Sequence, residues 1–492
     1  MNYADLFRAT LPETVLELTA LVVLAVDLGF LRKAALRRRH LAATVIGIAG
    51  CGAALWAVAI APALTVGGQV QETLLAAGGA AGVAQCGLLV LTALTLLPLL
   101  GTKFTRNPGE YVAVALMAAA GALIVAAAQD LLVIFVGLEL LSLCLYVLTA
   151  FAKRSGNSAE AAVKYYLFGG MSAAFLLFGF SYLYGITGST SLSTIVQFLQ
   201  TQNDLGVPLV GIAFVMIAAG LGFKVAAVPF HFWAPDAYEG APAPVAAFIA
   251  SVSKVASFAL LISIGAALLP RVGFSGTILH SPWTLILIFL AVASMIVGNL
   301  AALAQISVRR LIAYSAIAHA GYMLLGLAFF SGDRSSQAVL YYILTYGLTI
   351  VGAFIVVGWV EYATGSDTLD AFLGLYKRNP LLAASLLVFF LSLAGIPPLI
   401  GFWAKFNLFA AVLSADAGVV PFSLVALAIA FSAVSLYYYL QVLKRVWVMP
   451  AVDEHPIWMH PVALATTVVI ALAVIVLGCF PTLVQAWIAR FY

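Results

Sequence analysis

Apolar runs of about 20 residues recur along the whole chain, and this recurrence most limits how the chain can fold. A helix of about 20 apolar residues covers the hydrocarbon core of a bilayer. Because backbone in lipid must satisfy its own hydrogen bonds, each run is expected to be a helix. We count about fourteen runs, beginning near residues 11, 41, 76, 110, 130, 161, 207, 242, 281, 306, 335, 380, 421 and 460. The sequence therefore predicts an all-α, polytopic membrane protein of about 14 transmembrane helices.

Composition and cysteine usage narrow the class further. The chain is 64% hydrophobic and 9% charged, whereas soluble domains are about 25% charged. Pro12, Glu13 and Glu17 interrupt the first apolar run, so we do not expect a cleavable signal peptide. The four cysteines are scattered without a CxxC pair or a nearby histidine pattern. That spacing argues against a haem, zinc or iron–sulfur site on this chain.

The basic residues predict the orientation in the membrane. Four fall on one side of the predicted membrane, namely Arg8, Arg271, Arg334 and Arg490. Fifteen fall on the other side, namely Arg32, Lys33, Arg37, Arg38, Arg39, Lys103, Arg106, Lys153, Arg154, Arg309, Arg310, Lys377, Arg378, Lys444 and Arg445. Short loops rich in lysine and arginine stay on the cytoplasmic side. Both termini are therefore expected on the outward, periplasmic side of the cell inner membrane, which requires an even number of spans.

Two segments of the chain resemble each other and predict an inverted repeat. Residues 158–170 share Ala-Val-x-Tyr-Tyr with residues 335–347, and Phe-Trp-Ala occurs at both 232–234 and 402–404. Prolines interrupt the helix beside each Phe-Trp-Ala copy. Inverted repeats with broken helices are typical of transporter folds that bind ions at mid-membrane. We divide the chain into N-terminal helices 1–3 (residues 1–109), a first repeat (110–269), a second repeat (281–445) and a last helix (460–492).

Ionisable side chains inside the apolar runs are the candidate functional residues. They are Glu139, Lys164, Lys224, Lys254 and Lys405, with His231 beside the first break and His319 between small residues. A charged side chain at the bilayer centre costs about 2.5–3.5 kcal/mol on the insertion scale. Only Glu139 is a carboxylate clearly at mid-depth, so most of these lysines lack an acidic partner. An unpaired ammonium there is either hydrated or able to give up its proton, as a proton relay requires.

The bland alternative is that these groups form structural ion pairs between helices. That reading fits a bare Glu139–Lys224 pair better than it fits four lysines, a glutamate and a histidine spread over two repeats. Taken singly, His231 and His319 fit satisfied polar residues better than metal ligands. Lys164 aligns with Leu340 in the other repeat, so the two halves are not expected to be chemically equivalent.

The chain resembles the antiporter-like membrane subunits of proton-pumping NADH:quinone oxidoreductase, respiratory complex I. The resemblance covers nearly the whole chain and is carried by "VPFHFWAPDAYEGAPAPVAAFIASVSKVASF", "RRLIAYSAIAHAGYMLLGL" and "GIPPLIGFWAKF". It is greater for subunit N (chain 2 in organellar nomenclature) than for subunits L and M or the Mrp-type antiporter chains. The chain stops after its fourteenth predicted span, without the long lateral helix of L-type chains.

The resemblance implies a role for each candidate residue. Glu139 matches the glutamate of the fifth helix, and Lys224 the lysine of the broken seventh helix that pairs with it. Lys254 matches the central lysine of the eighth helix, and Lys405 the lysine of the broken twelfth helix, which is a glutamate in M-type chains. The accessory polar positions of the sixth and tenth helices are matched by Lys164 and His319.

These matches imply a proton-translocating subunit of a translocase whose redox chemistry occurs elsewhere. FMN, iron–sulfur clusters and quinone are expected in partner subunits and no cofactor or metal on this chain. Protons would enter from the cytoplasm, reach Lys224 or Lys254, pass His319 toward Lys405 and leave outward. Expected partners are neighbouring membrane subunits, the lipid bilayer and protons, and not nucleic acid. An Mrp-type cation/proton antiporter subunit is the alternative, and a purely structural helix scaffold is the third reading.

Overall fold

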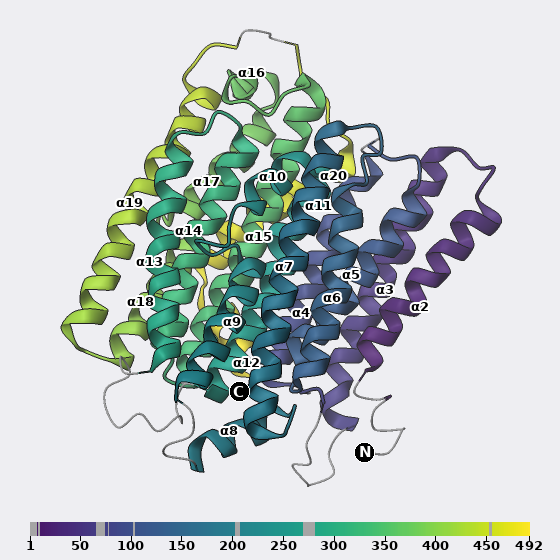
Figure 1. Ribbon diagram of the computed structural model, residues 1–492. Helices are drawn as coiled ribbons and strands as arrows, with labels where there is room; N and C mark the ends of the chain where they lie inside the picture. The colour runs from purple at the N-terminus through teal and green to yellow at the C-terminus, as the bar shows by residue number, and fades with distance from the viewer. Residues whose placement is uncertain are drawn as a thin grey trace.

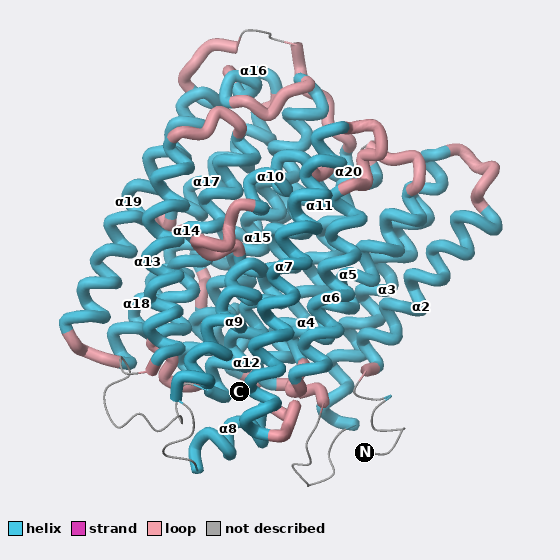
Figure 2. The backbone as a smooth tube through the Cα atoms, in the orientation of Figure 1, coloured by secondary structure: helices cyan, strands magenta, loops and turns pink. Residues whose placement is uncertain are grey.

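The computed structural model describes residues 7, 10–64, 74–76, 78–101, 104–201, 207–268, 281–451 and 455–492. These residues form a bundle of long, roughly aligned helices, with the two chain ends at the same end of the bundle (Figure 1). In the described part of the chain, extended pairing is limited to three isolated bridges, so the fold is all-helical (Figure 2). We call the end that carries both termini the termini end.

The first part of the chain contributes three N-terminal helices and one half of the bundle. The N-terminal elements are α2 (Leu11–Leu24), η1 (Ala25–Phe30), α3 (Leu36–Leu64), α4 (Gly79–Leu96) and η2 (Leu97–Leu100). The next group is α5 (Pro108–Ala127), α6 (Leu131–Thr149), α7 (Gly156–Thr187), α8 (Leu192–Thr201), α9 (Val207–Val225), α10 (Trp233–Gly240), α11 (Ala243–Phe248), η3 (Ile249–Ser253) and α12 (Lys254–Leu268).

The rest of the chain forms the other half of the bundle and its C-terminal helices. These elements are α13 (Pro282–Leu303), α14 (Val308–Ala328), α15 (Asp333–Thr364), η5 (Leu369–Phe372), α16 (Leu375–Arg378), α17 (Pro380–Ala394), α18 (Ile400–Ala415), α19 (Val419–Trp447), α20 (Pro461–Cys479) and α21 (Thr482–Ala489). Helix α16 lies at the end of the bundle opposite the termini end (Figure 1).

Twelve helices in the described ranges are long and apolar enough to cross a membrane. Helices α17 and α18 are shorter apolar helices, as the prolines between them predict. The expected first span is also helical, since α2 continues into the π-helical turn η1 up to Phe30, but it is outside the twelve. Its Asp27 pairs with Arg39 at 2.7 Å. The chain is thus an all-helical polytopic membrane protein with about 12 spans plus shorter apolar helices.

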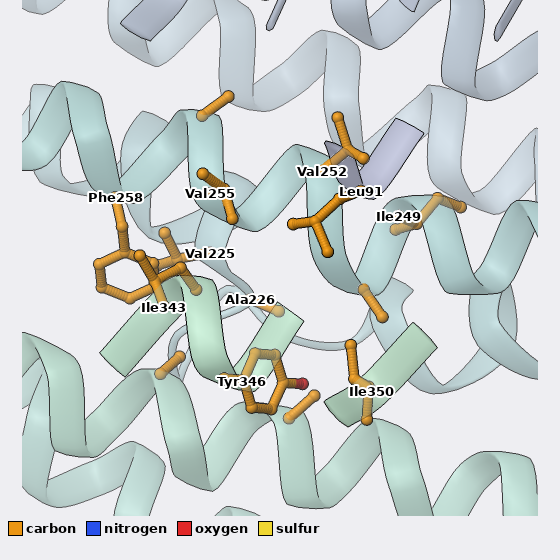
Figure 3. Close-up of a cluster of buried hydrophobic side chains, with 14 of the residues drawn as sticks. Leu91, Val225, Ala226, Ile249, Val252, Val255, Phe258, Ile343, Tyr346 and Ile350 are labelled. Carbon is orange, nitrogen blue, oxygen red and sulfur yellow. The ribbon is translucent and has the colours of Figure 1, made fainter. Parts of the chain in front are cut away.

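Burial differs strongly among the spans and explains where charged groups can lie. The span Ala243–Gly265, made by α11, η3 and the start of α12, is wholly buried, and α14 and α15 are nearly so. Apolar side chains of α12, η3 and α15 pack together there, with Tyr346 among them (Figure 3). Helix α19, by contrast, is mostly exposed on the outside of the bundle. Charged residues on the central helices are therefore kept away from lipid by protein.

Each half contains one interrupted helix. Helix α9 ends at Val225 and α10 begins at Trp233, while α17 ends at Ala394 and α18 begins at Ile400. Each interruption holds a cis peptide bond, before Pro229 and before Pro398. A helix that ends inside the bundle leaves its last carbonyl groups without intrahelical partners. Such carbonyls are available to bind a buried cation.

Helices α7 and α15 are alike in length and termination. Each has 32 residues and ends before a left-handed glycine, Gly188 or Gly365. Isolated bridges join Asp130 to Ser191 and Ser307 to Thr368, so both members of the second pair lie 177 residues after those of the first. Glycine adopts positive φ without steric cost, which suits it to these helix ends.

Candidate functional site

Lys224 occupies the last turn of α9, directly before the first interruption, and is only 5% exposed. Its ammonium donates a hydrogen bond to the Ser142 hydroxyl of α6, and that hydroxyl in turn donates to the Leu138 carbonyl. The Phe223 ring centroid lies 5.6 Å from Lys224 Nζ. The buried ammonium is therefore held by neutral groups.

Glu139 does not form the direct ion pair with Lys224 that the sequence predicted. Glu139 is half-buried on α6, and Ser142, three residues later, makes the contact with Lys224 instead. Residues three apart on a helix share one face, so the carboxylate and the hydroxyl approach α9 from the same side. The charge of Glu139 still acts on Lys224 without direct contact. The expected pair is thus a longer-range interaction with a serine at the lysine.

Lys254 follows a π-helical turn in the wholly buried span and is 1% exposed. Its ammonium donates to the Ala316 carbonyl of α14 at 2.6 Å. The Tyr346 ring centroid lies 5.8 Å away, on α15. Single π-turns inside helices occur frequently at functional sites. Here the turn sets Lys254 between α14 and α15, and this local feature is not evident from the sequence.

Lys405 lies beside the second interruption and is 6% exposed. Its ammonium donates to the Ala394 carbonyl at 2.9 Å and to the Ser432 hydroxyl at 2.7 Å. Ala394 is the last residue of α17, so its carbonyl is available because the helix ends there. Gly395 follows with φ 87°, and a Cβ at that position would lie 3.0 Å from Lys405 Cδ. Glycine thus provides both the turn and the space for the lysine chain.

His319 lies between the two lysines. Its Nδ1 pairs with the Tyr342 hydroxyl at 2.7 Å, and its Nε2 is buried with no hydrogen-bond partner in the described structure. The His319 ring lies 5.0 Å from the Tyr346 ring, which Lys254 also faces. It lies 5.8 Å from the Tyr322 ring, whose centroid is 5.4 Å from Lys405 Nζ. Lys254, His319 and Lys405 therefore form one connected row, which we call the central row.

The tyrosines of this row were missed at the sequence level. Tyr342 and Tyr346 belong to the "LYYILTYG" segment that indicated the repeat, four residues apart on one helix face. That spacing, opposite a buried histidine, was the available signal. Ser142 and Ser432 carried no comparable signal, because serine is common in helices that pack closely in membranes.

His231 lies inside the first interruption, as predicted, and is buried. Its Nδ1 has no hydrogen-bond partner among the described residues, and its ring lies 6.5 Å from the Tyr314 ring. Trp233 closes the interruption by donating its indole N–H to the Phe223 carbonyl at 2.9 Å. His231 is therefore one residue group removed from the central row, beside the helix that carries Lys224.

Lys164 differs from the other three lysines, because its side chain is 42% exposed. Its ammonium pairs with Glu160 at 2.8 Å and with Asp236 at 2.9 Å. Arg310 of α14 pairs with the same Asp236 and with Glu239, both at 2.7 Å. We call these five residues the end cluster. The expectation that Lys164 lacks a carboxylate partner is wrong.

Asp236 is the shared member of the end cluster. Partial burial alone raises the pKa of its carboxyl, but the bonds from Lys164 and Arg310 outweigh burial and hold that pKa below its ordinary value. Asp236 therefore remains a carboxylate that ties α7, α10 and α14 together. In the described part of the chain, no group of three or more His, Cys, Asp or Glu side chains could hold a metal ion.

Comparisons with known proteins agree with this geometry. Residues 128–432 match the family described as NADH:quinone oxidoreductase/Mrp antiporter, TM. NADH-quinone oxidoreductase subunit N 2 of Acidobacterium capsulatum is 47% identical over 502 residues, covering 99% of each chain. A chain of respiratory complex I from Thermus thermophilus with bound aureothin is 35% identical, with TM-score 0.78 and coverage of 96% of this chain and 98% of that one.

A more distant match shows the fold alone. A chain of the Mrp complex from Dietzia sp. DQ12-45-1b has TM-score 0.81 at 22% identity, and the match covers all of this chain and 97% of that one. The level of identity separates this match from the full-length match to subunit N. The chain therefore belongs to the subunit N family of NADH-quinone oxidoreductase, respiratory complex I.

Proposed function

We propose that this chain translocates protons as an antiporter-like subunit of complex I. Electron transfer from NADH to quinone, with FMN and iron–sulfur clusters, takes place in partner subunits and drives the transfer. The proposal rests on the membership in subunit N, together with buried ionisable groups that have no structural partner of opposite charge.

The central row is the observation that carries the proposal. Two buried lysines, each bound to neutral oxygen atoms, lie on either side of a histidine with one unpartnered ring nitrogen. Neutral acceptors stabilise an ammonium less than a carboxylate does, so each lysine is able to gain and lose a proton. His319 can accept at Nε2 while Nδ1 stays bonded to Tyr342. Lateral transfer therefore runs between Lys254 and Lys405 by way of His319, with waters completing the steps.

In the first half, Lys224 receives protons near the interruption and Glu139 controls its charge from a distance. His231 and Lys164 are accessory groups on this route. The inverted-repeat division at residues 110–269 and 281–445 is supported by the matched 32-residue helices and the two bridges 177 residues apart. Fourteen crossings follow if α2 with η1 forms the first and the α17–α18 pair forms one discontinuous crossing.

Lys405 provides the test of the proposal. We expect Lys405→Ala to assemble and to lose at least 10-fold in donor-driven proton transfer, because no other titratable group lies beside Ala394 and Ser432. Lys405→Glu, which restores a titratable group, is expected to retain more activity than Lys405→Ala. Proton uptake is measured in vesicles at equal amounts of assembled complex.

A bracing role for Lys405 predicts the opposite ranking. A carboxylate beside a carbonyl oxygen would be poorly solvated and would destabilise the site. Charge reversal would then be the more damaging of the two substitutions. Wild-type-like transfer by both variants would remove Lys405 from the relay.

The orientation has its own test. With both termini outward, a reporter fused after Tyr492 is expected to be active only on the periplasmic side. A reporter placed within the Arg37–Arg39 segment is expected to report from the cytoplasm. A cytoplasmic C-terminus would contradict both the orientation and the even number of crossings.

A further inference from the structure

Two cavities near the C-terminal helix α21 play no part in the proposed relay. The outer cavity, of about 510 Å³, is lined by polar groups of α15, α18 and α21, among them Arg334, Gln337, Asn407 and Gln485. The inner cavity, of about 480 Å³, is lined almost entirely by apolar side chains. Both cavities are open to the surroundings of this chain, so a molecule can enter them from outside.

The two cavities follow one face of α15. Gln337 and Tyr341 line the outer cavity, while Leu344 and Leu348 line the inner one. Leu348 follows Tyr341 by seven residues, so it lies about 10 Å further along the helix. Helix α21 contributes Gln485 to the outer cavity and Trp487 to the inner one. A single elongated molecule can therefore occupy both, with a polar end outside and an apolar end inside.

The outer cavity has features that select an anion. Arg334 lies in the first turn of α15, where the helix dipole also favours negative charge, and it makes no ion pair with a described carboxylate. Tyr341 is 1% exposed and its hydroxyl has no hydrogen-bond partner in the described structure. A buried hydroxyl without a partner costs free energy, and a ligand oxygen in the cavity would remove that cost.

We propose that this cleft binds one anionic phospholipid. Its phosphate contacts Arg334 and the Tyr341 hydroxyl, and an acyl chain extends along Leu344 and Leu348. A guanidinium with neighbouring amide and hydroxyl donors suits a phosphate, and an apolar groove open to the bilayer suits an alkyl chain. Arg334 and Tyr341 are outside the relay, so the proposal does not depend on proton transfer.

Photolabelling of the intact assembly tests the site. The probe is a phosphatidylglycerol with a photoreactive acyl chain, and labelled peptides are identified by mass spectrometry. We expect labelling of α15 or α21 beside the inner cavity, with at least a 5-fold loss in Arg334→Gln and in Leu348→Trp. Tyr341→Phe is expected to lose about half as much on a logarithmic scale. Arg490→Gln is the matched control, since Arg490 is exposed in the same part of the chain but does not line the cavity, and it is expected to label normally.

Competition identifies the occupant. Unlabelled phosphatidylglycerol is expected to compete, whereas phosphatidylcholine and inorganic phosphate compete at least 10-fold less well. Equal labelling of Arg334→Gln and wild type would overturn the proposal. So would better competition by an alkyl benzoquinone, which would assign the cleft to a quinone tail. Absence of label from this cleft in the intact assembly would indicate that a protein partner covers it. If Leu348→Trp fails to assemble, Val484→Trp blocks the same cavity from α21.

Discussion

The end cluster and the central row contain the same kind of cation in opposite surroundings. In the end cluster, Lys164 and Arg310 each contact two carboxylates and remain partly exposed. In the central row, Lys254 and Lys405 are buried and contact only carbonyl and hydroxyl oxygens. A cation between carboxylates stays charged and holds helices together. A cation among neutral oxygens keeps its two protonation states closer in free energy, so the difference separates bracing groups from carriers.

The largest expected effect comes from breaking the central row at its centre. His319→Leu removes the unpartnered Nε2 between the two lysines, and we expect at least a 10-fold loss of donor-driven proton transfer at normal assembly. Tyr342→Phe is the control, since it removes only the partner of Nδ1, and a loss of less than about 3-fold is expected. Equal losses in both variants would show that the hydroxyl, and not the imidazole, is the required group. Each variant is measured in vesicles against the rate of electron transfer.

A moderate effect is expected from separating the two groups that act on Lys224. Glu139→Gln removes the distant charge, while Ser142→Ala removes the direct acceptor. Because the proposed control of Lys224 is electrostatic, Glu139→Gln is expected to slow turnover several-fold and Ser142→Ala by less than about 2-fold. Removing one partner of a buried pair can cost about 3–5 kcal/mol, so assembly is quantified first. Normal turnover in a fully assembled Glu139→Gln complex would make the control by Glu139 wrong.

The smallest effect is expected in the end cluster. Asp236→Asn leaves Arg310 its contact with Glu239, and the lost contact with Arg310 is worth about 0.2–1 kcal/mol because it is partly exposed. Proton transfer is expected to remain within about 2-fold of wild type. A loss as large as that of His319→Leu would move Asp236 from the bracing groups to the carriers.

The end cluster also predicts a pH dependence of stability. The folded-state pKa of Asp236 lies below its ordinary value, so the unfolded chain binds the proton more readily. The stability from Asp236 is then present above the ordinary pKa of about 3.9 and is lost as pH falls through the lower folded-state value. Thermal unfolding of wild type and Asp236→Asn is expected to differ at pH 7 and to converge in strong acid. A constant difference across that range would contradict the assignment.

Helix number, membrane class and the inventory of ionisable residues were readable from the sequence. Runs of 20 apolar residues and the period of charged loops depend only on local composition, and the bilayer imposes helices on such runs. The interruptions beside Pro229 and Pro398 were also readable, because proline lacks a backbone donor and stops a helix where it stands. The motifs around Lys224, Lys254 and Lys405 were sufficient to indicate the family.

Only the tertiary structure decided which charges meet. Lys164 and Lys254 both lie in apolar runs, yet one reaches Asp236, 72 residues later, and the other reaches the Ala316 carbonyl. Ser142 rather than Glu139 contacts Lys224, since one helical turn along α6 decides which side chain meets the ammonium. The Ala394 carbonyl is a ligand of Lys405 because α17 ends where α18 folds back beside it. Sequence thus determines how many charges enter the membrane region, whereas packing determines which are neutralised and which stay free to exchange a proton.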